Sequence, residues 1–551
     1  MSHSFDGSEL IEAAGRRLLE RCAALGRFSG VALLARDGEV LFAAALGLAE
    51  REPARALAVD TRFALGSITK PFTAAAVLQL ETEGALALSD PIGLHLGDLE
   101  LPFAGAVTVE HLLLHRSGIP SLFKPHLGIE LSDGRAARPA SRAELCHVFS
   151  RLPLRFAPGT RTEYSNSGYA LLALIAERAS GQPWDDCLRE RVLAPAGLTR
   201  TSSAPAPGDA AGYLGGQRTR PAHASWLVGS GDLIAPAGDL AAWDSSAVAR
   251  ALRARGQHGL LASVRRGRRV LHHDGALAGF VNTYHSLPEY GMAVVVLTNS
   301  TPGWPHVPLA TRLVNRIADQ LADLALGQPP DQDGVPPLLA AGASAELDRC
   351  TGRYQLASGL ELEVRREGRS LWAETRGARP WTLWGLDALA GLDDTPRGRV
   401  AAALLAALAE GRGADALALF APDHARALSP GRLADLWQAL CRRVGAAPAF
   451  RLFQVHADVA YLRAGTPPLD AVVAFDEADR VVGFHVIESG VGPASRTVEL
   501  CARADDAARF WADGYRLAAP DVELSFEPAG ARAEAVVIHL GAGHRGVRQA
   551  D

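Results

Sequence analysis

The stretch that decides the fold runs over residues 60–84 and reads DTRFALGSITKPFTAAAVLQLETEG. From Ser67 onward its apolar residues recur at helical spacing, and Gly84 ends the pattern. Pro71 falls in the first turn, where a missing backbone N–H costs nothing. Ser67 and Lys70 are three residues apart and share one face of that turn. The stretch therefore predicts a helix that opens with a serine beside a lysine.

This pair of residues has two interpretations. A serine needs a base to become a nucleophile, and a desolvated, neutral Lys70 can serve as one for Ser67. The alternative is a serine that caps the helix N-terminus, followed by a solvated lysine. Lysine occurs only at Lys70 and Lys124, so all the others among the 56 Lys and Arg residues are arginine. Because only lysine can lose its proton at an accessible pH, the retained Lys70 favours the first interpretation.

Charge and composition exclude several functional classes. The formal net charge is −5 and no long block of Lys and Arg occurs, which argues against a nucleic-acid partner. No stretch approaches the ~18 apolar residues of a membrane helix. The N-terminus also lacks the hydrophobic segment of a secretory signal, and the six cysteines are scattered. We therefore expect a cytoplasmic protein with no membrane partner.

The histidines give no pattern that predicts a metal site. The 17 His residues show no HExxH motif, and the cysteines form no CxxC motif, so we expect neither a metal nor a cofactor. His111 and His115 lie four residues apart on a short predicted helix, but without a third ligand packing is the better interpretation. Ser117 and Ser230, in HRSGIP and GSGDL, are interpreted as turn residues.

A second motif, Tyr164-Ser165-Asn166, lies on a predicted loop just before a helix. A tyrosine can carry a proton if a nearby cation lowers its pKa, and an asparagine amide can hold a carbonyl oxygen. Asn and Ser are also common turn residues, and a tyrosine there often only packs. Taken alone, this motif is weak.

A third motif, His273-Asp274-Gly275, opens or runs along a predicted strand. A glycine in a strand permits the close approach of another backbone or of a ligand. The amide next to Gly275 could then bind an oxyanion together with the amide of Ser67. A histidine on a strand is more often structural, and the adjacent His272 should point to the other face of the sheet.

The arrangement of the predicted elements indicates a single sheet built from distant segments. Residues 28–50 read as two strands joined by a turn. Further strands fall near residues 262–299, and a helix is expected from about residue 308 to residue 326. Strands at both ends with helices between them predict a sheet packed against a mainly helical lobe.

In their order and separation, the three motifs resemble those of the serine β-lactamase-like family. The branch concerned contains class C β-lactamases, D-alanyl-D-alanine carboxypeptidases and related esterases. Ser67-x-x-Lys70 is similar to its first motif, Tyr164-x-Asn166 to its second and His273-x-Gly275 to its third. Segments such as TVEHLLLHRSGIP and FAPGTRTEYSNSGYALLALIAE extend the resemblance over residues 25–325.

The resemblance implies a covalent acyl-enzyme mechanism. Ser67 would attack a carbonyl carbon, with Lys70 and Tyr164 sharing the proton transfers. Asn166 would orient the substrate, and the backbone amides of Ser67 and Ala276 would form the oxyanion hole.

The third motif departs from the usual family pattern. His273 stands where penicillin-binding enzymes and β-lactamases usually carry lysine, which weakens any expectation of antibiotic hydrolysis or carboxylate recognition. His273, Gly275 and Ala276 would line the substrate site.

The expected fold class is α/β. Residues 1–326 would form a β-lactamase/transpeptidase-like catalytic domain, an antiparallel sheet flanked by helices and a helical lobe. A Pro/Gly-rich linker, residues 327–345, would lead to C-terminal β-barrel-like and α+β cone domains. Residues 346–392 and 491–551 resemble the β-rich accessory domain often appended in this family. Residues 393–490 resemble a cystatin or nuclear-transport-factor cone, either inserted into that domain or following in tandem.

The expected activity is cleavage of an ester, amide or small peptide bond through an acyl-serine intermediate. One alternative is an acyltransferase, in which an amine or alcohol replaces water, as in peptide-releasing or peptide-cyclising transacylases. Another is a binding or sensor protein that is acylated without turnover. The expected partners are a small-molecule or peptide substrate and, as an assembly, a homodimer.

Overall fold

The structure is a computed structural model of the chain. In the N-terminal part it describes residues 7–24, 28–122, 137–150, 153–214, 216–220, 222–256, 258–301 and 307–328. In the C-terminal part it describes residues 348, 350–356, 361–367, 370–376, 396–420, 422, 425, 430, 431, 433, 435, 437, 438, 450–456, 459–464, 469–475, 480–488, 497–502, 509–512, 522–529, 532–539 and 544–548. The chain divides into two compact units, Met1–Thr301 with Ala310–Asp333, and Pro302–Leu309 with Gly334–Asp551.

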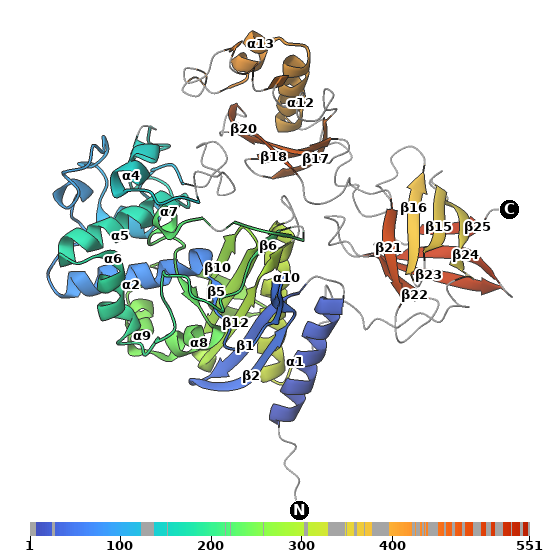
Figure 1. Cartoon of the computed structure of the whole chain (residues 1–551), viewed down its shortest axis with the longest axis horizontal. Coiled ribbons are helices and arrows are strands. Elements are labelled where there is room, and N and C mark those ends of the chain that lie inside the picture. The colour runs from blue at the N-terminus through green and yellow to red at the C-terminus, as the bar shows by residue number, and fades with distance from the viewer. Residues whose placement is uncertain are drawn as a thin grey trace, which may run out of the picture. The chain divides into compact units, whose positions relative to one another are not determined.

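The first unit is built on a six-stranded antiparallel sheet with the strand order β2-β1-β12-β11-β10-β9 (Figure 1). The first and last segments of the unit meet in its centre, because Gly30 pairs with Thr298. This confirms the predicted sheet of distant segments. The strands are β1 (Gly30–Arg36), β2 (Glu39–Leu46), β9 (Leu261–Arg265), β10 (Arg268–Leu277), β11 (Phe280–Leu287) and β12 (Met292–Thr298).

Helices cover both faces of this sheet. On β11, Tyr284 donates a hydrogen bond to Asp244 of α8 (Ala237–Ser245), whereas its neighbour His285 is bonded to Asn315 of α10 (Val307–Ala325). Because adjacent strand residues point to opposite faces, α8 and α10 lie on opposite faces of the sheet. The helix α1 (Gly7–Ala24) packs on β2.

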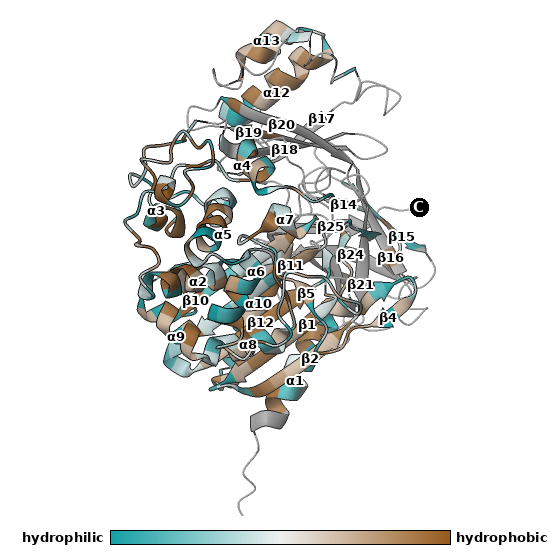
Figure 2. Cartoon of the chain, turned by 60° about the vertical axis from the view of Figure 1, so that its left-hand side comes forward, coloured by the Kyte–Doolittle hydropathy of each residue, from teal (hydrophilic) through white to brown (hydrophobic). Residues whose placement is uncertain are grey.

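The helical lobe is organised around a helix that is buried on all sides. In α2 (Lys70–Thr82), nearly every residue from Lys70 to Leu80 is buried, and the helix packs against α5 (Asn166–Ser180) and α9 (Ala247–Ala254). Strand β1 is likewise apolar over most of its length, as its brown colour in Figure 2 shows. Side chains on the buried part of α2 are removed from water, and Lys70 is one of them.

The remaining elements of the first unit are short. Its helices are η1 (Gly66–Thr69), η2 (Ile92–Leu94), α3 (Val109–Leu113), α4 (Arg142–Ser150), α6 (Trp184–Leu188), η4 (Arg189–Leu193), α7 (Ala224–Leu227) and η5 (Pro288–Tyr290). Its short strands are β3 (Leu48–Arg51), β4 (Ala54–Ala56), β5 (Phe63–Ala64), β6 (Tyr213–Leu214), β7 (Gln217–Arg218), β8 (Ile234–Ala235) and β13 (Ser300–Thr301). Every helix in the described part of the chain is too short or too polar to cross a membrane.

The second unit contains a closed barrel and a separate sheet with helices. The barrel takes strands from two stretches of chain, and β14 pairs with β25 to close it. Its strands are β14 (Gly352–Leu356), β15 (Glu361–Glu367), β16 (Ser370–Arg376), β21 (Thr497–Ala502), β22 (Arg509–Ala512), β23 (Val522–Ala529), β24 (Arg532–His539) and β25 (His544–Arg548).

In sequence, a four-stranded sheet and the described helices α12 and α13 lie between the two stretches of the barrel. Val473 and Val481 of the sheet share an apolar cluster with Leu404 and Leu408 of α12. The domain boundaries stay a prediction, and residues 329–345 of the expected linker lie outside the described residues. The elements are α12 (Pro396–Ala409), α13 (Gly413–Ala418), β17 (Phe450–His456), β18 (Val459–Ala464), β19 (Leu469–Phe475) and β20 (Val481–Glu488).

Candidate active site

Ser67 lies on a tight turn that precedes the long helix. The predicted helix does not start as an α-helix at Ser67, because residues Gly66–Thr69 form a 3-10 turn and α2 begins at Lys70. Side chains three residues apart eclipse each other in a 3-10 turn. The Nζ atom of Lys70 accordingly lies 2.9 Å from the Oγ atom of Ser67. Ser67 remains partly exposed, so a substrate can reach it.

Lys70 is fully buried, and its contact partners are all uncharged. Its Nζ lies 2.8 Å from Oδ1 of Asn166 and 2.8 Å from the backbone oxygen of Ser230. Burial lowers the pKa of Lys70 well below its usual value, and the carboxylate of Asp232 opposes this only in part. No carboxylate in the described residues forms an ion pair with Lys70, so burial favours the neutral form of its amine.

Tyr164 approaches Ser67 from the side of the helical lobe. Its hydroxyl donates a hydrogen bond of 2.7 Å to Oγ of Ser67, and its ring centroid is 4.7 Å from Nζ of Lys70. Burial raises the pKa of the Tyr164 hydroxyl, the opposite of the lowering that a nearby cation would cause. The phenol is therefore a proton donor in the resting site.

Asn166 is the first residue of α5, and contacts of its backbone and of its side chain fix its position. The side chain of Ser165 caps this helix by accepting a hydrogen bond from the amide of Gly168. The backbone amide of Asn166 donates a hydrogen bond to Oγ of Ser121 at 3.0 Å. Its side-chain Nδ2 donates to the carbonyl of Leu122 at 3.2 Å. The Asn166 carboxamide is thus held with Oδ1 turned to Lys70.

The third motif faces the serine from strand β10. His273 is 4% exposed, and its ring centroid lies 6.0 Å from that of Tyr164. Its Nδ1–H donates to the backbone oxygen of Asp274 at 2.7 Å, which leaves Nε2 as an acceptor. Burial lowers the pKa of His273 to about 3, so the group is neutral at physiological pH. His273 therefore brings hydrogen-bonding capacity and no charge to the site.

Glycines allow β10 to lie directly against the turn that carries Ser67. A Cβ atom on Gly275 would lie 1.9 Å from the carbonyl oxygen of Leu65, a distance that no side chain tolerates. Gly66 has φ +60°, and a Cβ atom there would lie 3.1 Å from the amide nitrogen of Ala276. The amide of Ala276 is therefore close to the turn, as an oxyanion hole shared with the Ser67 amide requires.

Two contributors to the site were not predicted from the sequence. Ser230 does lie in a turn, but its backbone oxygen is a direct partner of Lys70, and backbone roles leave no trace in residue identity. His115 does not share a helix with His111, because α3 ends at Leu113 and His115 has φ +55°. Its ring packs against Tyr164 with the centroids 4.6 Å apart, and its Nδ1 accepts from the amide of Ser165.

An antiparallel sheet with a helical lobe, joined at a serine, a buried lysine and a tyrosine, agrees with the β-lactamase/transpeptidase-like fold expected from the sequence. The β-lactamase family matches residues 16–319, more than half of the chain. The chain therefore belongs to the β-lactamase family.

Curated relatives match over part of their length. Esterase EstB of Burkholderia gladioli is 37% identical over 177 residues, which are 30% of this chain and 45% of EstB. Penicillin-binding protein 4* of Bacillus subtilis is 33% identical over 186 residues, 33% of this chain and 40% of that protein. The chain thus spans about half or less of the length of these two relatives.

Solved structures show the same fold. The octameric penicillin-binding protein homologue from Pyrococcus abyssi has a TM-score of 0.52 at 19% identity, over 96% of this chain and 98% of that chain. The D-amino acid amidase of Ochrobactrum anthropi SV3, complexed with L-phenylalanine, has a TM-score of 0.51 at 23% identity, over 57% and 98%.

Proposed function

We propose that this chain is a serine hydrolase that cleaves an ester, amide or small peptide bond through an acyl-Ser67 intermediate. The observation that carries the proposal is a fully buried Lys70 amine, without an ion-pair partner in the described residues, 2.9 Å from the Ser67 hydroxyl. A hydroxyl next to a neutral amine can transfer its proton as it attacks a carbonyl carbon.

The hydrogen bonds around Lys70 suit this role. A neutral amine has two N–H donors and one lone pair. The donors fit the oxygens of Asn166 and Ser230, and the lone pair then accepts the Ser67 hydroxyl proton. A charged amine could make the same three contacts as a donor only, but burial without a counter-charge disfavours that form.

The proton transfers can be written so that they balance. Oγ of Ser67 bonds to the carbonyl carbon while its proton moves to Nζ of Lys70. The bond to the leaving group breaks as the leaving group takes the proton of Tyr164, and Lys70 then returns a proton to Tyr164. Water attacks the acyl group, gives a proton to Lys70 and releases the acid, and Ser67 regains its proton from Lys70. The amides of Ser67 and Ala276 would hold the oxyanion.

The third motif narrows the substrate class. Because His273 is neutral, it supplies no positive charge with which to hold a carboxylate beside the scissile bond. We therefore expect uncharged acyl esters or amides to be better substrates than peptides that end in a free carboxylate. The relative EstB is named an esterase, which agrees with this expectation.

Intact-mass analysis tests the proposal directly. The protein is exposed to 4-nitrophenyl esters, a β-lactam and a D-alanyl peptide, and the mass of the acyl adduct is followed with time. We expect an ester-derived adduct that decays with turnover in the native chain and none in the Ser67→Ala variant. An adduct that survives in Ser67→Ala would place the nucleophile elsewhere, and an adduct that never decays would favour a non-hydrolytic binding protein.

Self-association is a second part of this proposal. The Pyrococcus abyssi structure, which aligns with nearly the whole chain, is described as octameric. We expect this chain to form a homo-oligomer, and a strictly monomeric mass by light scattering would contradict that.

A further inference from the structure

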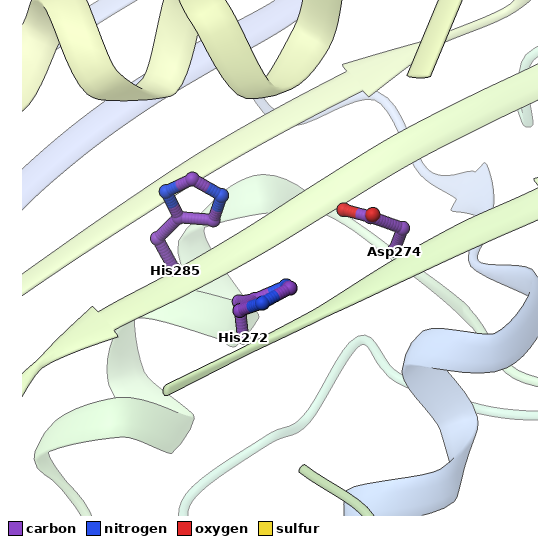
Figure 3. A group of neighbouring side chains, drawn as sticks. All are labelled: His272, Asp274 and His285. Carbon is purple, nitrogen blue, oxygen red and sulfur yellow. The ribbon is translucent and has the colours of Figure 1, made fainter. Parts of the chain in front are cut away.

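The face of β10 and β11 that is turned away from Ser67 carries its own group of polar side chains. In this antiparallel pair His272 lies opposite His285, and Asp274 lies opposite Thr283. His272 and Asp274 alternate with the active-site residue His273, so they point to the other face, which α10 covers. Figure 3 shows His272, Asp274 and His285 close together on these two strands.

These three side chains have the composition and the spacing of a metal site. One ligand atom from each of them lies within 4.8 Å of the other two. Two imidazoles and a carboxylate suit zinc and related divalent ions. Ligand atoms at ~2.1 Å from a tetrahedral ion lie ~3.4 Å apart, so small side-chain rotations would complete the site.

An unsatisfied polar atom points to a missing partner. His272 is 7% exposed, and its Nδ1 is buried without a hydrogen-bond partner in the described structure. Burying such an atom without a partner destabilises the fold, and a bound ion would offset this cost.

Groups around the three residues are arranged as outer-shell partners. Thr283 and Asn315 both donate to Oδ1 of Asp274, at 2.7 Å and 3.0 Å, and the hydrogen bonds of the described residues leave Oδ2 free. Nε2 of His285 lies 2.8 Å from Oδ1 of Asn315, and its Nδ1 lies 3.6 Å from a carboxylate oxygen of Asp319. If Nε2 bound an ion, Nδ1–H would face Asp319, which is the carboxylate–histidine–metal arrangement.

The charge balance also permits a cation. The arginines beside His285 have carboxylate partners: Arg265 pairs with Asp319 at 3.5 Å, and Arg266 and Arg268 both pair with Asp323. Asp274 has no cationic partner among the ion pairs of the described residues. His285 also lines a small cavity together with Asp319 and three arginines, Arg265, Arg266 and Arg268.

We propose that His272, Asp274 and His285 bind one divalent transition-metal ion of the zinc type. The ion would tie β10 to β11 behind the third motif, with Asn315 of α10 as an outer-shell partner of Asp274 and His285. It would not touch the substrate, because the sheet separates it from Ser67. It would instead hold the strand that carries His273 and Gly275. Sequence spacing could not indicate the site, because its ligands come from two paired strands.

Cobalt provides the test, because Co²⁺ reports on its ligands by its visible spectrum. The full-length protein is freed of metal by dialysis against a chelator and then titrated with Co²⁺, followed by competition with Zn²⁺ or Ca²⁺. We expect about one Co²⁺ per chain, displacement by Zn²⁺ and not by Ca²⁺, and a higher Tm with the ion bound. We expect the His272→Gln and Asp274→Asn variants to bind at least tenfold more weakly.

A matched pair of cysteine variants distinguishes the loss of a ligand from misfolding. In His272→Cys we expect a thiolate-to-cobalt charge-transfer band, which identifies position 272 as a ligand. His95 provides the control, because it pairs with Asp90 at 2.9 Å elsewhere in the lobe, and His95→Cys should show no such band. Absence of Co²⁺ binding, unchanged binding in His272→Gln, or equal competition by Ca²⁺ would overturn the proposal.

Discussion

At the scale of single residues, the pKa of the Lys70 amine is determined mainly by its removal from water. Burial favours the uncharged form of the group at this position, and a lysine amine can adopt that form whereas a guanidinium cannot lose its proton. The Lys70→Arg variant should therefore lose acylation about as completely as Lys70→Ala, by about 10²–10⁴-fold.

Stopped-flow measurement of acylation by an activated ester checks this prediction. Circular dichroism of both variants shows whether the fold survives. If Lys70→Arg acylated at a near-normal rate, Lys70 would act only through its charge and not as a base.

Asp232 is a buried acid, and its effect on stability should depend on pH. It accepts hydrogen bonds from Nε1 of Trp184 and the amide of Gly229, yet burial raises its pKa to about 7. The unfolded carboxyl has a pKa of about 3.9. The folded state therefore binds this proton more tightly, and the resulting stability is present below about pH 4 and is lost as the pH rises through about 7.

The Asp232→Asn variant should lack this pH dependence. The free energy of unfolding of the variant, relative to the native chain, should rise by at most about 1.4 kcal/mol per pH unit between about pH 4 and pH 7. Urea unfolding at several pH values measures it. A difference between the two proteins that does not change with pH would mean that Asp232 is ionised in the folded state over the whole range.

At the scale of secondary-structure elements, the contact between β10 and η1 sets the geometry of the site. Because the Leu65 carbonyl would lie 1.9 Å from a Cβ atom on Gly275, the Gly275→Ala variant must push the two elements apart. We expect a loss of about 1–3 kcal/mol of stability and about a 10²-fold slower acylation, because the oxyanion amide moves.

Gly238 offers a matched control for this substitution. It lies in α8, and a Cβ atom there meets no heavy atom within 4 Å. The Gly238→Ala variant should acylate normally and gain up to about 1 kcal/mol of stability. Chemical denaturation and adduct formation measure both variants. Equal behaviour of the two variants would show that the close approach of β10 to η1 does not matter.

The elements also show what the sequence can predict. The helical spacing of the apolar residues predicted a helix over residues 67–84. It could not show that residues 66–69 form a 3-10 turn. The alternation of side chains along a strand correctly predicted that His272 and His273 point to opposite faces of the sheet. The pairing of His272 with His285 depends on the register of β10 against β11, which is fixed by packing across the whole sheet.

The three motifs were identifiable because their chemistry requires particular side chains. The structure places Ser67, Lys70, Tyr164 and Asn166 within contact distance of one another, and their catalytic roles stay a prediction. The carbonyl of Ser230 was not identifiable, because any residue supplies the same atom. Sequence patterns therefore predict the reactive groups better than the backbone atoms that orient them.

At the scale of the whole molecule, the barrel of the second unit is built from two separate stretches of chain. The first of these stretches ends with β16, and the second begins with β21. The two strands pair antiparallel, with Glu374 opposite Thr497. The ends of the intervening segment are therefore neighbours. A segment with adjacent ends can be removed without stretching the chain, because closing a shorter loop changes the free energy only slightly.

Deletion of residues 393–490 should therefore leave the barrel and the catalytic unit folded, if that segment is an inserted domain as we propose. Residues 377–392 and 491–496 would then join β16 to β21. The matched control removes residues 544–551, which takes away β25, the strand that pairs with β14 to close the barrel. Thermal unfolding of each variant measures whether the barrel is folded, and formation of the adduct at Ser67 measures acylation. We expect a cooperative transition and normal acylation in the internal deletion and a lost barrel transition in the control. If the internal deletion unfolds like the control, the segment is part of the barrel's own core and the chain is not built by insertion.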